Sequence, residues 1–176
     1  FKLRREARAA LAVFGDGASS KGDVYEAMNV AGAWTLPVVF VVTNNQWAIS
    51  VSRAKQTAAA TLAQKAIAAG FTGVQVDGND VIAVRDVVAD ALEKARSGGG
   101  ATLVEALTYR LADHTTVDDA SRYRDDEEVA RHWREEPFTR LRKYLASTHA
   151  WSREDEQRLI ESCRAEIESA AEAYLA

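Results

Sequence analysis

Two short polar clusters in the first 45 residues have residue types that suit a metal ion and a phosphate. Gly15-Asp16-Gly17 follows the apolar run 11–14, and Asn44-Asn45 follows the apolar run 38–42. Because open α/β sheets bind ligands at the carboxyl ends of parallel strands, we expect Asp16 and Asn45 to lie side by side. A carboxylate and an amide oxygen are hard ligands, suited to a magnesium ion that also holds a diphosphate.

Neither cluster is specific by itself, since a Gly-Asp-Gly triplet at a strand end is more often a plain turn. It is not a P-loop, because no Gly-Lys-Ser/Thr follows it. It is not the dinucleotide fingerprint either, because Gly22 comes too late to be the third glycine. The signal lies in the pairing of the two clusters across one strand–helix–strand unit.

The composition narrows the class of protein. With 176 residues, of which 47% are hydrophobic, the chain is long enough to bury a core. Its net charge of −4 argues against nucleic acid as a partner. No apolar stretch approaches the roughly 20 residues of a membrane span, so we expect no membrane partner. The single Cys163 cannot form an internal disulfide, which favours a reducing, cytoplasmic location.

The alternation of apolar runs and helical patterns predicts an α/β fold with a doubly wound parallel sheet. Asp23 heads a variant capping box for a helix that ends near Gly32. A second helix is expected over the Ala-rich stretch 57–69, closed by Gly70. The predicted strands are 11–14, 38–42, 74–76 and 102–107, and a further helix is predicted over 81–95.

A polar stretch without periodicity, 109–124, separates this unit from a charged helical region. Loops of that length inside a compact domain are usually functional or disordered. We expect an α/β domain over 1–124 and a C-terminal helical extension over 125–176, with helix starts at Pro137 and Ser152. The first strand would be a sheet edge, so we also expect a portion of the protein before Phe1.

Two segments resemble a known family. Residues 15–50, GDGASSKGDVYEAMNVAGAWTLPVVFVVTNNQWAIS, contain a pattern similar to the thiamine-diphosphate motif, which begins Gly-Asp-Gly and ends Asn-Asn. Residues 108–124, TYRLADHTTVDDASRYR, resemble an active-site loop. Both look like the alpha subunit of the heterotetrameric 2-oxo acid dehydrogenase component that decarboxylates the substrate, and they resemble bacterial pyruvate dehydrogenase (acetyl-transferring) in particular.

The resemblance implies a set of cofactor contacts. Asp16 would ligate Mg²⁺ through its carboxylate, Asn45 through its amide oxygen and Trp47 through its backbone carbonyl. The backbone N–H groups of Gly17 and Ala18 would meet the diphosphate of thiamine diphosphate. Gly15 and Gly17 would allow close backbone approach. At Thr43 the chain departs from relatives that carry a charged diphosphate contact there.

The resemblance also gives His114 a catalytic role over the diphosphate and the reacting centre, although an isolated loop histidine is more often a solvated surface residue. Tyr123 and Arg124 would order its loop, and Arg122 would also face the site. We interpret His132 and His149 as surface residues on charged helices. Glu105 is interpreted as a salt-bridged residue at the edge of the core.

The implied function is thiamine-diphosphate-dependent oxidative decarboxylation of pyruvate, with acyl transfer to a lipoyl acyltransferase partner and onward formation of acetyl-CoA. The family's beta subunit supplies the glutamate that activates the cofactor, so this chain alone should be inactive. The first alternative is the branched-chain 2-oxo acid dehydrogenase alpha subunit. A phosphate-handling α/β enzyme and a non-catalytic interaction domain are two further hypotheses.

Overall fold

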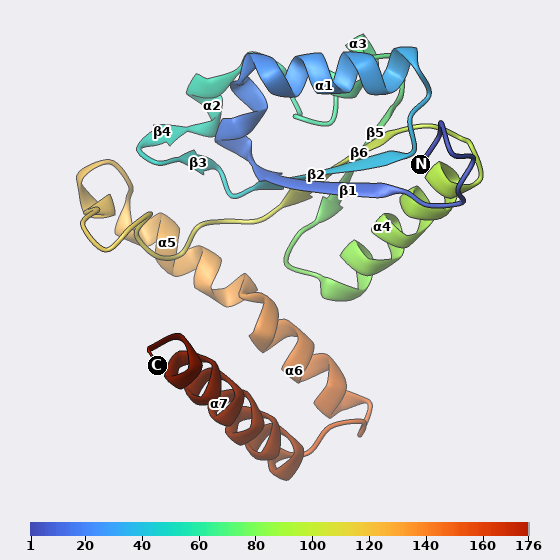
Figure 1. The fold of residues 1–176 in the computed structure, drawn as a ribbon. Helices are drawn as coiled ribbons and strands as arrows, with labels where there is room; N and C mark the ends of the chain where they lie inside the picture. Colours follow the sequence, from blue (N-terminus) through green and yellow to red (C-terminus); the bar gives the residue numbers. More distant parts are fainter. Residues whose placement is uncertain (176) are drawn as a thin grey trace. The chain divides into compact units, whose positions relative to one another are not determined.

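A computed structural model describes residues 1–175, and its centre is a four-stranded parallel sheet. The strands follow the order β1-β2-β6-β5 across the sheet, which makes β1 an edge strand (Figure 1). Strands β2 and β6 are almost wholly buried, as expected for mainly apolar strands whose two faces are both covered. The bounds are β1 Ala10–Gly15, β2 Val38–Asn44, β5 Thr72–Asp77 and β6 Thr102–Leu107.

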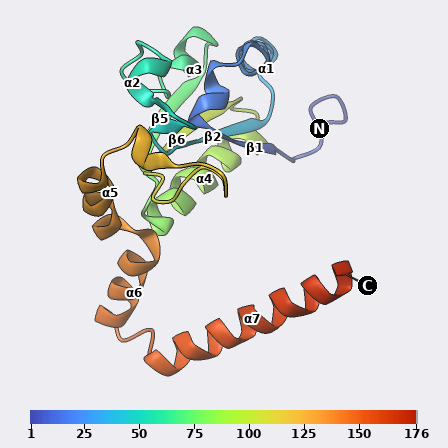
Figure 2. The ribbon, with the colours of Figure 1, turned by 90° about the vertical axis from the view of Figure 1, so that its left-hand side faces the viewer.

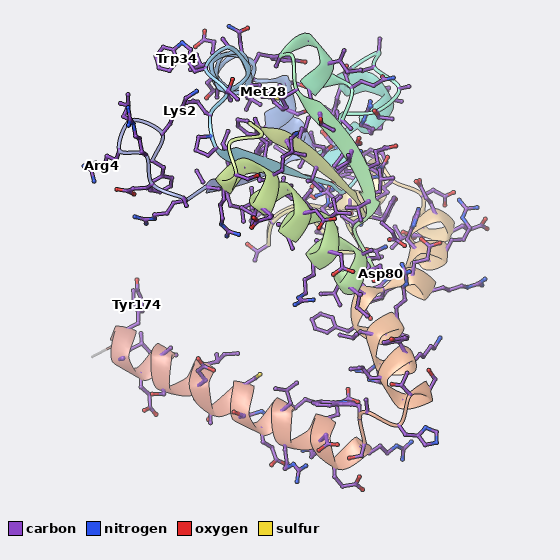
Figure 3. All side chains as sticks on the ribbon, turned by 90° about the vertical axis from the view of Figure 1, so that its right-hand side faces the viewer. Lys2, Arg4, Met28, Trp34, Asp80 and Tyr174 are labelled. Carbon is purple, nitrogen blue, oxygen red and sulfur yellow. The ribbon has the colours of Figure 1, made fainter. Side chains whose placement is uncertain are left out.

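Helices cover both faces of this sheet, so the predicted doubly wound α/β fold is confirmed. Helix α1 (Gly22–Ala33) lies on one face and α4 (Val81–Arg96) on the other (Figures 1 and 2). The α1 side holds a core cluster that includes Met28, Phe40 and Leu103. Figure 3 labels Met28 on this side of the sheet. The α4 side holds a second cluster, formed by Val39, Val41, Val76, Ala91, Ala95, Val104 and Ala106.

The pairing of β1 with β2 places the two polar clusters at one edge of the sheet. Gly15 stands opposite Thr43 in the register. Asp16 and Asn45 therefore follow directly after the carboxyl ends of adjacent strands. The chain after Asn45 turns into a small antiparallel hairpin, β3 (Trp47–Ala48) with β4 (Val51–Ser52).

Helix α1 does not start with the predicted capping box. A 3-10 turn, η1 (Asp16–Ser20), precedes it, and its N-cap is Lys21 without a side-chain cap. Asp23 therefore lies inside the first turn, where its Oδ1 accepts from the neighbouring Val24 N–H at 3.1 Å. A carboxylate there still favours the helix start through the helix dipole.

The expected helix over 57–69 is wrong for most of its length. Two single-turn helices, α2 (Arg53–Gln56) and α3 (Lys65–Ala68), flank an irregular stretch. Tertiary bonds satisfy its backbone instead: Ala63 N–H donates to Glu105 Oε2 at 2.9 Å, and the Arg53 guanidinium donates to two backbone carbonyls. These contacts override the helix propensity of alanine. Gly70 does end the segment, at φ +80°.

The remaining elements of the described chain are helices, with bounds η2 Ala120–Arg122, α5 Asp126–His132, η3 Trp133–Glu135, α6 Pro137–Ser147 and α7 Arg153–Leu175. Contacts divide the chain into two compact units, Phe1–Pro137 and a second from Phe138 onward. Pro137 begins α6 as predicted. Ser152 caps α7, since its Oγ accepts from Asp155 N–H at 3.1 Å while the Asp155 carboxylate accepts from Ser152 N–H at 3.0 Å.

Two histidines differ from their interpretation as surface residues on helices. His132 is half-buried, with its ring stacked on Tyr109 at 3.9 Å between centroids. His149 is exposed but lies in the turn after α6, at φ +57°. The N-terminal segment folds beside the end of α1, where Lys2 Nζ donates to the Trp34 carbonyl (Figure 3). None of the helices within residues 1–175 is both long and apolar enough to span a bilayer.

The contact between α1 and the turn before β5 gives a stability prediction. A Cβ at Gly32 would lie 1.8 Å from the Ala69 carbonyl oxygen, whereas a Cβ at Gly22 in the same helix meets nothing within 4 Å. Gly32→Ala in the full-length protein should therefore lower the free energy of unfolding by about 1–3 kcal/mol, the typical cost of overpacking. Urea unfolding measures this change.

Gly22→Ala is the matched control. It should leave the free energy of unfolding unchanged or raise it slightly, because an alanine loses less backbone entropy on folding than a glycine does. Equal stability of the two variants would contradict the close packing described for Gly32.

Candidate functional site

Asp16 is the buried acid of the candidate site. The residue is only 2% exposed, at the start of the turn that follows β1. Its Oδ2 accepts a hydrogen bond from Gln56 Nε2 at 2.6 Å. Within residues 1–175 no lysine, arginine or histidine forms an ion pair with it. A buried carboxylate normally requires compensating charge or hydrogen bonds, so this position suits a cation.

Asn45 follows the neighbouring strand and is half-buried. Its Oδ1 accepts from Trp47 N–H at 3.1 Å, which closes a local turn, and Arg110 N–H donates to its backbone carbonyl at 3.2 Å. Gln46, between them, adopts φ +72°. The turn holds the Asn45 carboxamide oxygen in place, and that oxygen retains a second lone pair for a ligand.

A buried carboxylate in the central strand β6 fixes the end of β2. Asn44 Nδ2 donates to Glu105 Oε1 at 2.7 Å, while Glu105 Oε2 accepts from Ala63 N–H at 2.9 Å and from Gln75 Nε2 at 3.1 Å. Glu105 is 1% exposed and is held by amides, so its interpretation as a salt-bridged residue is wrong. Gln75 is its register partner on β5, a signal that the sequence offers once strand pairing is known.

The backbone of η1 forms a close surface beside the hairpin. A Cβ at Gly17 would lie 2.7 Å from the Cβ of Ala48, so only glycine allows this approach. At Gly15 a Cβ would meet no protein atom within 4 Å, so protein packing alone does not require glycine there. Gly17 and Ala18 precede the N-terminus of α1, where backbone N–H groups and the helix dipole favour an anion.

Lys65 supports the η1 turn through Ser19. Its role was not predicted from the sequence. Its side chain is buried and donates to the Ser19 carbonyl at 2.7 Å and to Ser19 Oγ at 3.0 Å. The ammonium also lies 5.1 Å from the ring centre of Tyr25. The positive charge therefore lies next to the turn that contains Asp16. A lysine in an Ala-rich stretch carries no sequence signal for such a contact.

Arg110 ties the hairpin to the polar loop. Its guanidinium donates to the Trp47 carbonyl at 3.3 Å, to the Ile49 carbonyl at 2.9 Å and to Tyr123 Oη at 2.7 Å. The rings of Trp47 and Tyr123 lie 5.5 Å apart. The carbonyl expected to bind the metal is thus oriented by Arg110, a residue to which the sequence analysis gave no role.

His114 is exposed on the loop, which is folded back on itself. Its backbone N–H donates to Asp118 Oδ2 at 2.8 Å, and the Tyr123 hydroxyl donates to the same oxygen. These two donors, Tyr123 first, hold the pKa of Asp118 below its usual value. The stability that these hydrogen bonds give the loop is therefore fully present above the ordinary pKa of an aspartate. It is lost as the pH falls through the lowered pKa of Asp118.

Arg124 closes the same loop from inside the core. It is buried, and its guanidinium donates to the carbonyls of Arg110, Leu111 and Ala112. Arg122 is exposed. The loop bonds connect His114 to the strand ends through Asp118, Tyr123 and Arg110, and none of them uses the imidazole of His114.

The described residues hold no group of three or more His, Cys, Asp or Glu side chains that could bind a metal. A cation here would therefore rely on one carboxylate, neutral oxygens and oxygens brought by an anionic ligand. Magnesium accepts such a set, because it is usually held by one or two carboxylates together with phosphates and water. The residue types and the glycine-lined turn fit a magnesium diphosphate.

Comparison with known proteins shows the family to which the chain belongs. Residues 1–174 match the model of the family described as "Dehydrogenase E1 component". The chain is 52% identical over 149 residues to the 3-methyl-2-oxobutanoate dehydrogenase subunit alpha of Mycobacterium tuberculosis (strain ATCC 25618 / H37Rv), covering 85% of this chain and 41% of the relative.

The chain is also 45% identical over 173 residues to the pyruvate dehydrogenase E1 component subunit alpha of Staphylococcus epidermidis (strain ATCC 12228 / FDA PCI 1200), covering 97% of this chain and 47% of the relative. The same figures hold for the Staphylococcus aureus (strain COL) subunit. The chain thus spans less than half the length of these curated relatives. The resemblance inferred from the two motifs is confirmed: the chain belongs to the dehydrogenase E1 component family.

Proposed function

We propose that this chain is part of the alpha subunit of a pyruvate dehydrogenase (acetyl-transferring), which decarboxylates pyruvate with thiamine diphosphate and Mg²⁺. The acetyl group would pass to a lipoyl acyltransferase partner and on to acetyl-CoA. The observation that carries the proposal is the buried Asp16 carboxylate, which lacks a basic partner in the described chain and follows the strand next to that of Asn45.

We assign separate cofactor contacts to the residues at this edge of the sheet. Asp16, the Asn45 carboxamide oxygen and the Trp47 carbonyl would ligate Mg²⁺, while the N–H groups of Gly17 and Ala18 would bind diphosphate oxygens. When bound, thiamine diphosphate supplies the carbanion chemistry that removes carbon dioxide from a 2-oxo acid. The protein contributes the metal ligands, the orientation and the exclusion of water.

His114 is proposed as the catalytic residue of this chain. Its imidazole is free of hydrogen bonds to the described residues, and its backbone is fixed through Asp118. A histidine so placed can donate a hydrogen bond to a phosphate oxygen or to a developing oxyanion, or transfer a proton. The loop bonds of Arg110, Tyr123 and Arg124 would hold it at that position.

A beta subunit is part of the proposal, in a heterotetramer that completes each site. The relatives are named as alpha subunits, which supports a partner for this chain as well. The single free Cys163 supports a cytoplasmic location.

A branched-chain substrate is the second candidate, because identity to the 3-methyl-2-oxobutanoate dehydrogenase relative is higher over a shorter match. We expect the full-length subunit, assembled with its beta partner, to use pyruvate with kcat/KM at least about tenfold above that for 3-methyl-2-oxobutanoate, since each added methyl group is worth about 10- to 200-fold in a fitted pocket.

Steady-state assays with both 2-oxo acids measure the ratio, and the alpha subunit alone is the control that should show no turnover. A preference for the branched acid would move the assignment to the second candidate. Turnover by the alpha subunit alone would contradict the shared site.

Asp16→Ala tests the metal ligand. In the assembled enzyme it should weaken Mg²⁺-dependent binding of thiamine diphosphate by at least about 100-fold, because even supporting residues of a metal site cost about 10- to 100-fold. The melting temperature of the cofactor-free variant should stay close to that of the wild type. Calorimetric titration measures the affinity.

Asp90→Ala, at an exposed position on α4, is the control and should bind like the wild type. Unchanged affinity in Asp16→Ala would refute the ligand assignment.

His114→Ala separates binding from chemistry. The variant should keep the cofactor affinity of the wild type within about threefold and lose roughly 100-fold or more of kcat, the usual range for a general acid or base. His149→Ala, in the exposed turn after α6, should retain full activity. A kcat of His114→Ala close to that of the wild type would show that His114 has no catalytic role.

A further inference from the structure

Gln56 reaches the candidate metal ligand from a separate element. It is the last residue of α2, forty positions from Asp16, and its Nε2 donates to Asp16 Oδ2 at 2.6 Å and to the Val51 carbonyl at 3.2 Å. Both partners are acceptors only, so the amide group must direct its NH₂ toward them. Hydrogen bonds to a charged acceptor are about twice as strong as neutral ones.

The same amide has an unused acceptor. Gln56 Oε1 is buried and accepts no hydrogen bond from the residues that the structure describes. It shares its carbon with Nε2, so it lies beside the Asp16 carboxylate. A buried acceptor without a donor is costly and rare, and this one stands next to a buried carboxylate that has no basic partner. The two groups together fit a cation that carries water molecules.

The short helix that presents Gln56 is anchored independently. Arg53 N–H donates to the Gln46 carbonyl at 2.8 Å, and its guanidinium donates to the Thr57 and Ala59 carbonyls at 3.3 and 2.7 Å. Gln56 is therefore held at the site by the surrounding backbone, and its bond to Asp16 is not needed to keep α2 in place.

We propose that Gln56 is a positioning residue for the metal that binds Asp16. Its Nε2 holds Asp16 Oδ2 so that Oδ1 is presented to Mg²⁺, and its Oε1 accepts from a donor that arrives with the cation, for which a water of the hydration shell is the fitting chemistry. Magnesium keeps several waters when it binds to proteins. The inference rests on the proposed function, since it assumes the magnesium diphosphate.

Gln56→Met and Gln56→Glu test this role in the full-length subunit assembled with its beta partner. Methionine keeps the unbranched shape without a donor, and glutamate keeps the volume but places an acceptor against Asp16. The measurement is the Mg²⁺ concentration that half-saturates thiamine diphosphate binding, followed by quenching of tryptophan fluorescence. We expect it to rise roughly 10- to 100-fold in both variants, as for other residues that orient metal ligands.

A second readout excludes a merely structural effect. Binding should recover at saturating Mg²⁺, and the melting temperature of the cofactor-free variants should match the wild type. Gln64→Met, at an exposed glutamine before α3, is the matched control and should leave the Mg²⁺ requirement unchanged.

An unchanged Mg²⁺ requirement in Gln56→Met, with a wild type that binds normally, overturns the inference. So does a loss of binding that saturating Mg²⁺ fails to restore and that parallels a lower melting temperature. If the wild-type complex itself shows no Mg²⁺-dependent binding of thiamine diphosphate, the proposed function fails first, and that result is distinct from either outcome for Gln56.

Discussion

A buried carboxylate without a basic partner in the described chain is the constraint around which this edge of the sheet is organised. Asp16 lies where β1 ends, its charge met by one amide from Gln56. Such a group is stable in the interior only if other charge or hydrogen bonds compensate it. The sheet places Asn45 just beyond the end of the neighbouring strand, so two residues with oxygen ligands of the type that magnesium prefers follow adjacent strands.

Hydrogen bonds between residues far apart in the sequence support the segments that carry these oxygens. Glu105 accepts hydrogen bonds from β2, from β5 and from the irregular stretch before α3, and so fixes Asn44. Lys65 holds the η1 turn from behind through Ser19. Rigid support of this kind matters because a site built on strand ends keeps its geometry only when the second layer of contacts is satisfied.

Strand positions and the two polar clusters could be predicted from the sequence, because the strands are rich in apolar residues and the clusters come at the ends of two of them. Local helix signals were less reliable. The Ala-rich stretch after Gln56 has strong helix propensity, yet Glu105 captures one of its N–H groups and breaks the helix. The roles of Gln56 and Lys65 depend on contacts forty or more residues away, which no local pattern contains.

The proposal on which the others depend is that Asp16 and Asn45 ligate the same divalent ion. The most direct measurement is a crystal structure of the assembled enzyme with thiamine diphosphate and Mn²⁺ in place of Mg²⁺, in which anomalous scattering locates the metal. Our account predicts one anomalous peak about 2 Å from a carboxylate oxygen of Asp16 and from the carboxamide oxygen of Asn45. A metal bound elsewhere, or an Asp16 carboxylate turned away from it, would contradict the account.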